Sequence, residues 1–114
     1  MAARKFAADF ESLTNKSANQ QGLWADLSDC KQIDYGIVKA SGTITAGVVE
    51  LVSRQNENQS LMRVGEFDLS TMAFINTRGF QSSEPKPNGA QFAWIITTPI
   101  VGGTITCFIN GQHS

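Results

Sequence analysis

Hydrophobic and polar residues alternate along much of the chain after residue 22, as they do in strands that cover a core with one face. The densest strand signals lie in residues 92–98 and 104–109, which are rich in β-branched and aromatic side chains. A short segment with one proline and two glycines, residues 99–103, separates them. We predict a β-hairpin that turns at this segment, with its first strand central in the sheet because apolar side chains fall on both faces.

Other segments have the same character and are separated by polar or glycine-containing links. The further predicted strands are residues 22–27, 33–40, 48–53, 61–69 and 73–77, and residues 43–47 lead into the third of them. Residues 55–60 form a wholly polar link, and residues 81–90, with two prolines and a glycine, form the longest predicted loop. Turn signals recur about every ten residues, which predicts an all-β fold: an antiparallel β-sandwich or jelly roll of about seven or eight short strands.

The N-terminal segment has a different composition. Residues 1–22 are rich in Ala, Asn, Gln and Lys, and Phe6, Phe10 and Leu13 are spaced as on one side of a short helix. We therefore predict an N-terminal arm over residues 1–22 and a sandwich domain over residues 23–114. Two interpretations of the arm stay open: it covers one end of its own sandwich, or it docks on a neighbouring subunit through Phe6 and Phe10.

Composition narrows the possible partners. The 114 residues suit one domain. Nine Lys and Arg against ten Asp and Glu, with no basic block, disfavour nucleic acid as a partner. No apolar run approaches the roughly 20 residues that a membrane-spanning helix needs, and Asp9 and Glu11 stand where a signal peptide would be apolar. We expect a cytoplasmic protein without a membrane partner.

The sequence offers little for catalysis. It contains one histidine, His113, next to the last residue, so neither a Ser-His-Asp nor a Cys-His arrangement has a well-packed base. The closest acidic grouping, Asp26, Asp29 and Asp34, has the spacing of no calcium loop and is interpreted as solvated acids. We predict no enzyme activity, no catalytic or metal-binding residue and no cofactor.

The two cysteines lie in unlike surroundings. Cys107 alternates with Ile105 and Ile109 and is predicted to point inward, whereas Cys30 lies in a polar run. These surroundings argue against a disulfide, but whether Cys30 and Cys107 pair stays open at this point.

Three segments together resemble a known family. They are GTITAGVVEL at residues 42–51, EFDLS at residues 66–70 and WIITTPIVGGTIT at residues 94–106. Small β-sandwich structural proteins of tailed bacteriophages have a similar pattern: a Gly- and Thr-rich strand start, a polar loop in the middle and a late strand running into a Gly-Gly-Thr segment. The resemblance covers roughly residues 40–110 and leaves the predicted arm outside it.

The resemblance implies a non-enzymatic virion protein, assembled in the host cytoplasm. The expected role is a capsid decoration, or cement, protein that self-associates and binds and stabilises the shell of the major capsid protein. Its hypothetical contact residues are Phe6, Phe10, Leu13 and Trp24. The alternative is a tail, baseplate or fibre module that binds glycans through exposed aromatic residues. The candidates for such a platform are Trp24, Tyr35, Phe80 and Trp94, but packing in the core or in an interface is the preferred interpretation of these residues, because Trp94 lies among apolar neighbours.

Overall fold

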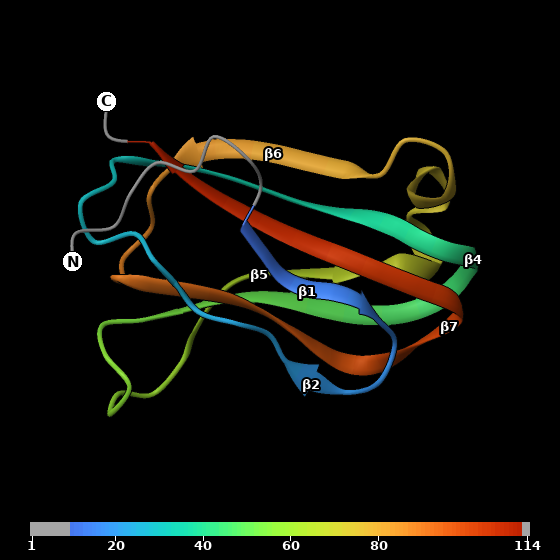
Figure 1. Ribbon diagram of the computed structural model, residues 1–114, viewed down its shortest axis with the longest axis horizontal. Helices are drawn as coiled ribbons and strands as arrows, with labels where there is room; N and C mark the ends of the chain where they lie inside the picture. The colour runs from blue at the N-terminus through green and yellow to red at the C-terminus, as the bar shows by residue number, and fades with distance from the viewer. Residues whose placement is uncertain (1–9, 113–114) are drawn as a thin grey trace.

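The computed structural model describes residues 10–112, which form seven strands and two short 3₁₀ helices (Figure 1). In chain order the elements are β1 (Phe10–Lys16), β2 (Gln20–Gln21), β3 (Ala25–Asp26), β4 (Gln32–Arg54), β5 (Met62–Asp68), η1 (Leu69–Thr71), η2 (Ala73–Asn76), β6 (Phe80–Pro85) and β7 (Gln91–Gln112). The all-β antiparallel prediction is confirmed.

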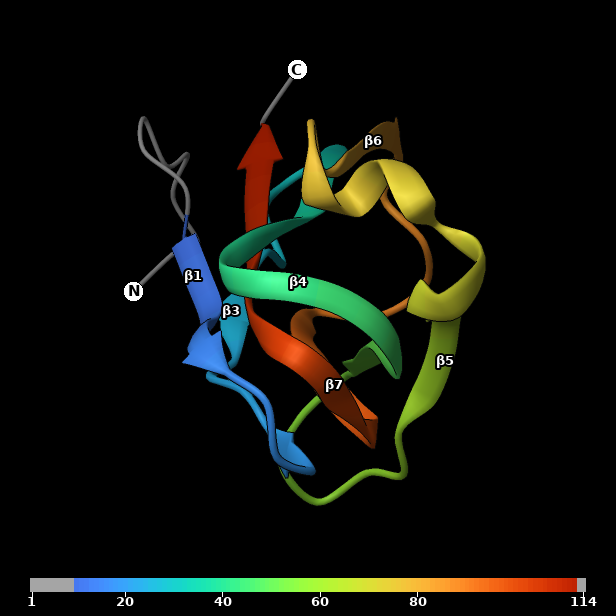
Figure 2. The same ribbon diagram turned by 90° about the vertical axis from the view of Figure 1, so that its right-hand side faces the viewer.

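Two long strands, β4 and β7, form the frame of the molecule. They pair antiparallel along almost their whole length, and the other strands pair with one of these two. Both long strands bend sharply (Figure 2), and their register is irregular between Lys39 and Val49. One half of this ladder carries β1 and β6, and the other half carries β2, β3 and β5. The sheet thus folds over itself as a sandwich.

One core lies between the two layers. The first half of β4 supplies Ile33 and Ile37, and its second half supplies Val49 and Leu51; all four are fully buried in a single cluster. Alternate residues of β7 join the same cluster. They are Phe92, Trp94, Ile96, Ile105, Cys107 and Ile109. Each long strand therefore contributes to both layers and to their common core.

The sequence pattern predicts a hairpin turn at residues 99–103, and this prediction is wrong. Residues 99–103 are a bend inside β7 and not a hairpin turn, because the chain continues along the same β4 neighbour and Ile100 packs into the core. At Gly102 the backbone φ is +97°, and a Cβ there would lie 2.0 Å from the carbonyl oxygen of Thr43. Only glycine permits this close approach of the two strands.

Several local predictions also need correction. Residues 73–77 form not a strand but mainly η2, and the predicted loop at residues 81–90 begins within β6. The Asp68 side chain accepts a hydrogen bond from the Ser70 backbone N–H and so caps η1. Residues 33–40 and 48–53 belong to one strand, β4, so the strands are not all short.

The predicted arm is divided by the structure. Residues 10–16 and 20–21 are strands that pair with β7, so the helical spacing of Phe10 and Leu13 does not produce a helix. Leu13 pairs with Cys107, and its side chain is only 2% exposed. Residues 1–9, and with them Phe6, lie outside the described residues.

Cys30 and Cys107 are free and buried. Burial raises the pKa of both thiols, and the carboxylate of Asp29 raises that of Cys30 further. Within residues 10–112, no helix is long and apolar enough to cross a membrane, and no group of three or more His, Cys, Asp or Glu residues could hold a metal ion.

Candidate interaction surface

An exposed leucine lies beside a groove at the edge formed by β1 to β3, residues 10–26, which we term the β1–β3 edge. Leu23 is 67% exposed, more than any other large hydrophobic residue in the described part of the chain. The groove has a volume of about 540 Å³. Its lining residues are Glu11, Ser12, Leu13, Thr14, Lys16, Gln20, Gln21, Gly22 and Leu23. An apolar side chain beside an open groove can contact a protein partner.

Ser12 fixes the shape of this edge. Its buried hydroxyl donates to the Leu23 carbonyl at 2.8 Å and accepts from the Trp94 backbone N–H at 3.0 Å. The Leu23 backbone N–H in turn donates to the Ser12 carbonyl at 2.8 Å. A Cβ on Gly22 would lie 2.3 Å from that carbonyl oxygen, so glycine is needed for β1 to approach this closely. The exposed Leu23 side chain therefore stands on a backbone that is held in place.

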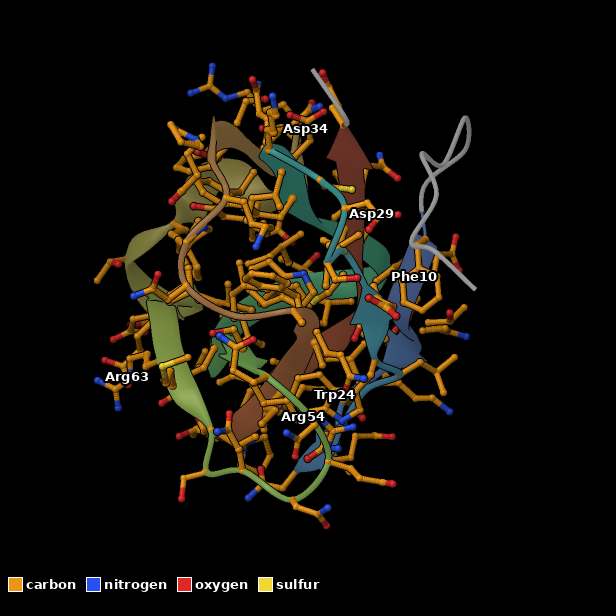
Figure 3. The ribbon with its side chains drawn as sticks, turned by 90° about the vertical axis from the view of Figure 1, so that its left-hand side faces the viewer. Phe10, Trp24, Asp29, Asp34, Arg54 and Arg63 are labelled. Atoms are coloured by element: carbon orange, nitrogen blue, oxygen red, sulfur yellow. The ribbon has the colours of Figure 1, made fainter. Side chains whose placement is uncertain are left out.

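Trp24 lies next to Leu23 and is covered by an arginine (Figure 3). The Arg54 guanidinium carbon is 3.8 Å from the centroid of the Trp24 ring, a cation–π contact. Arg54 is also held through its Nε, which donates to the Gln91 side-chain oxygen at 2.8 Å. The indole N–H of Trp24 is buried and has no hydrogen-bond partner in the described structure. One face of this ring is therefore occupied by the protein itself.

Three of the four predicted contact residues lie in the β1–β3 edge, but not all at its surface, and Phe6 lies outside the described residues. Phe10 is half-buried against the core, opposite Ile109 of β7. Leu13 belongs to the core, so its side chain has little surface for a partner, and Trp24 is half-buried. Sequence reasoning treated Leu23 only as a strand residue. Its exposure follows from its place just outside the two-residue strand β3, which no local pattern specifies.

The proposed aromatic platform is not on the surface. Trp94 and Tyr35 are buried, with ring centroids 5.9 Å apart. Phe67 packs on both of these rings, and Phe80 packs on Tyr35 and Phe67; both phenylalanines are half-buried. The interpretation of Trp94 and Tyr35 as packing residues is confirmed.

Two of the three acidic residues singled out in the sequence, Asp26 and Asp34, accept hydrogen bonds within the protein. Asp26 accepts a hydrogen bond from the Ser28 backbone N–H at 3.1 Å. Asp34 accepts from the Gln112 side-chain amide at 2.6 Å and from the Ser83 hydroxyl. Asp29 lies apart from Asp34 in the loop before β4 (Figure 3). His113 lies outside the described residues.

Comparison with known proteins gives a likeness of fold. No protein-family model matches the chain, and no curated protein matches it. Among solved structures, the crystal structure of the SPBc2 prophage-derived protein YomS superposes with a TM-score of 0.63, covering 90% of each chain at 10% sequence identity. The chain shares the fold of a prophage-derived protein. At this identity the likeness to YomS concerns the backbone arrangement alone.

Proposed function

We propose that this protein is a non-enzymatic bacteriophage structural protein, and that it acts as a capsid decoration protein on the shell of the major capsid protein. The observation that carries the proposal is the fold match to YomS over 90% of each chain. The sequence resemblance to small phage sandwich proteins supports the same origin independently. Both cysteine thiols are buried, so neither is exposed to a substrate, which supports a role without nucleophilic catalysis.

The β1–β3 edge supplies the contact in this proposal. Leu23 would insert into the capsid surface, and the groove beside it would receive a side chain from that surface. Only 17% of the residues are charged, below the roughly 25% of average soluble proteins, so less charge has to be desolvated on binding. When several associated copies bind one shell at the same time, their modest single contacts act together and the protein stays bound.

The proposal is tested on purified particles. We expect the protein in a regular array on the shell, and shells stripped of it to lose integrity at lower temperature. Adding Leu23→Asp protein to stripped shells is expected to give at least tenfold weaker attachment. The matched control is Leu61→Asp, at a leucine that is 44% exposed just before β5, a strand that β4 and β7 separate from β3 in the sheet. Absence from the particle, or a position on the tail, would overturn the capsid assignment, and the tail position would favour a tail or baseplate module.

A further inference from the structure

Besides the β1–β3 edge, the sandwich has an opening between β5 and β6. Both strands pair with β4, β5 at residues 48–53 and β6 at residues 32–37, and no ladder joins them to each other in the described sheet. A groove of about 330 Å³, which we term the seam groove, lies near one end of this opening. Its lining residues are Ser53, Met62, Arg63, Val64, Glu84, Pro87 and Asn88.

The seam groove combines apolar walls with one basic and one acidic side chain, and two further carboxylates stand at its rim. Met62 is 40% exposed, and Val64 is half-buried beside it. Arg63 is the arginine that lines the groove. Its Nη2 atom is 3.1 Å from Oε2 of Glu50 and 3.8 Å from Oε2 of Glu66.

A third carboxylate, Glu84, lines the groove and accepts a hydrogen bond from the buried Tyr35 hydroxyl. The groove and its rim thus carry one guanidinium and three carboxylates: those of Glu50 and Glu66 beside Arg63, and that of Glu84 in the lining. A segment that carries cations next to an apolar side chain is complementary to this surface.

We propose that the seam groove binds residues 1–9 of a second copy of this chain. Arg4 and Lys5 are the only two adjacent cations in the sequence, and Phe6 follows them directly. The two cations face the carboxylates of Glu66 and Glu84, and the Phe6 ring packs against Met62 and Val64. Nine extended residues span up to about 30 Å, enough to bridge two neighbouring molecules.

A second copy is a better donor of this segment than the same copy. Phe10 pairs with Ile109, Ile109 with Tyr35, and Tyr35 with Ser82 of β6, so two strands separate the start of β1 from β6. Three strand spacings amount to roughly 14 Å, and a chain that crosses strands at right angles makes no ladder hydrogen bonds on the way. The same copy would therefore use about half of the segment merely to reach the groove. A neighbouring copy can approach the groove without this crossing.

The test is the self-association of the purified full-length protein, measured by sedimentation equilibrium. It needs no phage particle, so its outcome is separate from that of the proposed function. We expect the wild type to self-associate, and the double variant Arg4→Glu with Lys5→Glu to do so at least tenfold more weakly. Glu66→Lys combined with Glu84→Gln should weaken association similarly, and glutamine keeps an acceptor for Tyr35. Asp29→Asn, at an exposed acid outside the groove, is the matched control.

Mixing the two weakened proteins gives the decisive measurement. One has an acidic N-terminal segment and an acidic groove, and the other has a basic segment and a groove with added positive charge. The mixture should therefore recover association that neither protein shows alone. Circular dichroism establishes that each variant is folded. A monomeric wild type, association that is insensitive to both sets of substitutions, or no recovery on mixing would each overturn the proposal.

Discussion

The two tryptophans of this chain differ in burial and in the hydrogen bonding of the indole N–H. Trp94 is fully buried, and its indole N–H donates to the Phe108 carbonyl at 3.0 Å. Trp24 is half-buried under Arg54, and its indole N–H has no hydrogen-bond partner within residues 10–112. Loss of the indole nitrogen therefore has different consequences at the two positions.

Trp94→Phe is expected to lower the free energy of unfolding by about 2–4 kcal/mol, because it leaves a buried carbonyl without its donor and opens a cavity. Trp24→Phe breaks no hydrogen bond within the described structure and should cost about 1 kcal/mol or less. Urea denaturation followed by far-UV circular dichroism measures both values. Equal losses of unfolding free energy in the two variants would contradict the expected difference between Trp94 and Trp24.

The ionisation of Tyr35 is expected to make the free energy of unfolding depend on pH in the alkaline range. Burial, and then the hydrogen bond to Glu84, raise the pKa of its hydroxyl above the ordinary value of about 10. A raised pKa in the folded state means that the stabilising contribution is complete below about pH 10 and is lost as the pH rises through the folded-state pKa. We expect the free energy of unfolding of the wild type to fall above about pH 10, and that of Tyr35→Phe to fall less over the same interval. Parallel pH profiles would show that the Tyr35 hydroxyl does not contribute.

At the scale of elements, the bend of β4 and β7 is where sequence and structure differ most. Residues 92–98 and 104–109 are strands as predicted, but the proline and glycines between them have the composition both of a turn and of a bend in one long strand. Local sequence cannot distinguish the two, because the difference lies in whether β4 continues alongside. Similarly, the spacing of Phe10 and Leu13 fits one face of a helix, yet pairing with β7 makes this segment a strand.

The bend can be tested at its glycines. Gly102→Ala combines a positive φ with a Cβ placed 2.0 Å from the Thr43 carbonyl oxygen, so we expect a loss of at least about 2 kcal/mol in unfolding free energy. Gly65→Ala in β5 is the matched control, because its Cβ would meet only the Phe67 ring, at 3.1 Å, and the ring can shift. Its cost should be about 1 kcal/mol or less by thermal or urea unfolding. If Gly102→Ala were tolerated as well as the control, close approach at the bend would not be essential.

The candidate interaction surface was predicted less well than the fold. Phe10 and Trp24 lie in the β1–β3 edge and stay predicted contact residues, whereas Leu13 points into the core and the exposure of Leu23 has no signal in the sequence pattern. Alternation reports which residues share a strand face, whereas exposure at an edge depends on which strand lies next to it. The β5–β6 opening likewise follows from the shared partner β4 and has no signal in either strand alone.

At the scale of the whole molecule, the two layers are not independent units. Both are built on the same two strands, and Ile37 in one layer and Leu51 in the other belong to a single core. Damage to either layer therefore removes support from the other.

We accordingly predict one cooperative unfolding transition. Ile37→Ala and Leu51→Ala should each lower the free energy of unfolding by about 2–5 kcal/mol without producing a second transition. Tryptophan fluorescence and far-UV circular dichroism, recorded on the same urea series, should give coincident curves. Separate midpoints in either variant would show that one layer can persist without the other.

The place of β7 in the chain bears on how the protein is made. Strands β1, β2 and β3 are synthesised first, yet β7, the last strand in chain order, is their ladder partner. A nascent chain that ends before β7 therefore contains these segments without their hydrogen-bonding neighbour, and β4 without the strand along most of its length. Folding must wait until Gln91–Gln112 have left the ribosome, so a ribosome stalled before or within the codons of this strand would hold an unfolded chain available to chaperones and proteases.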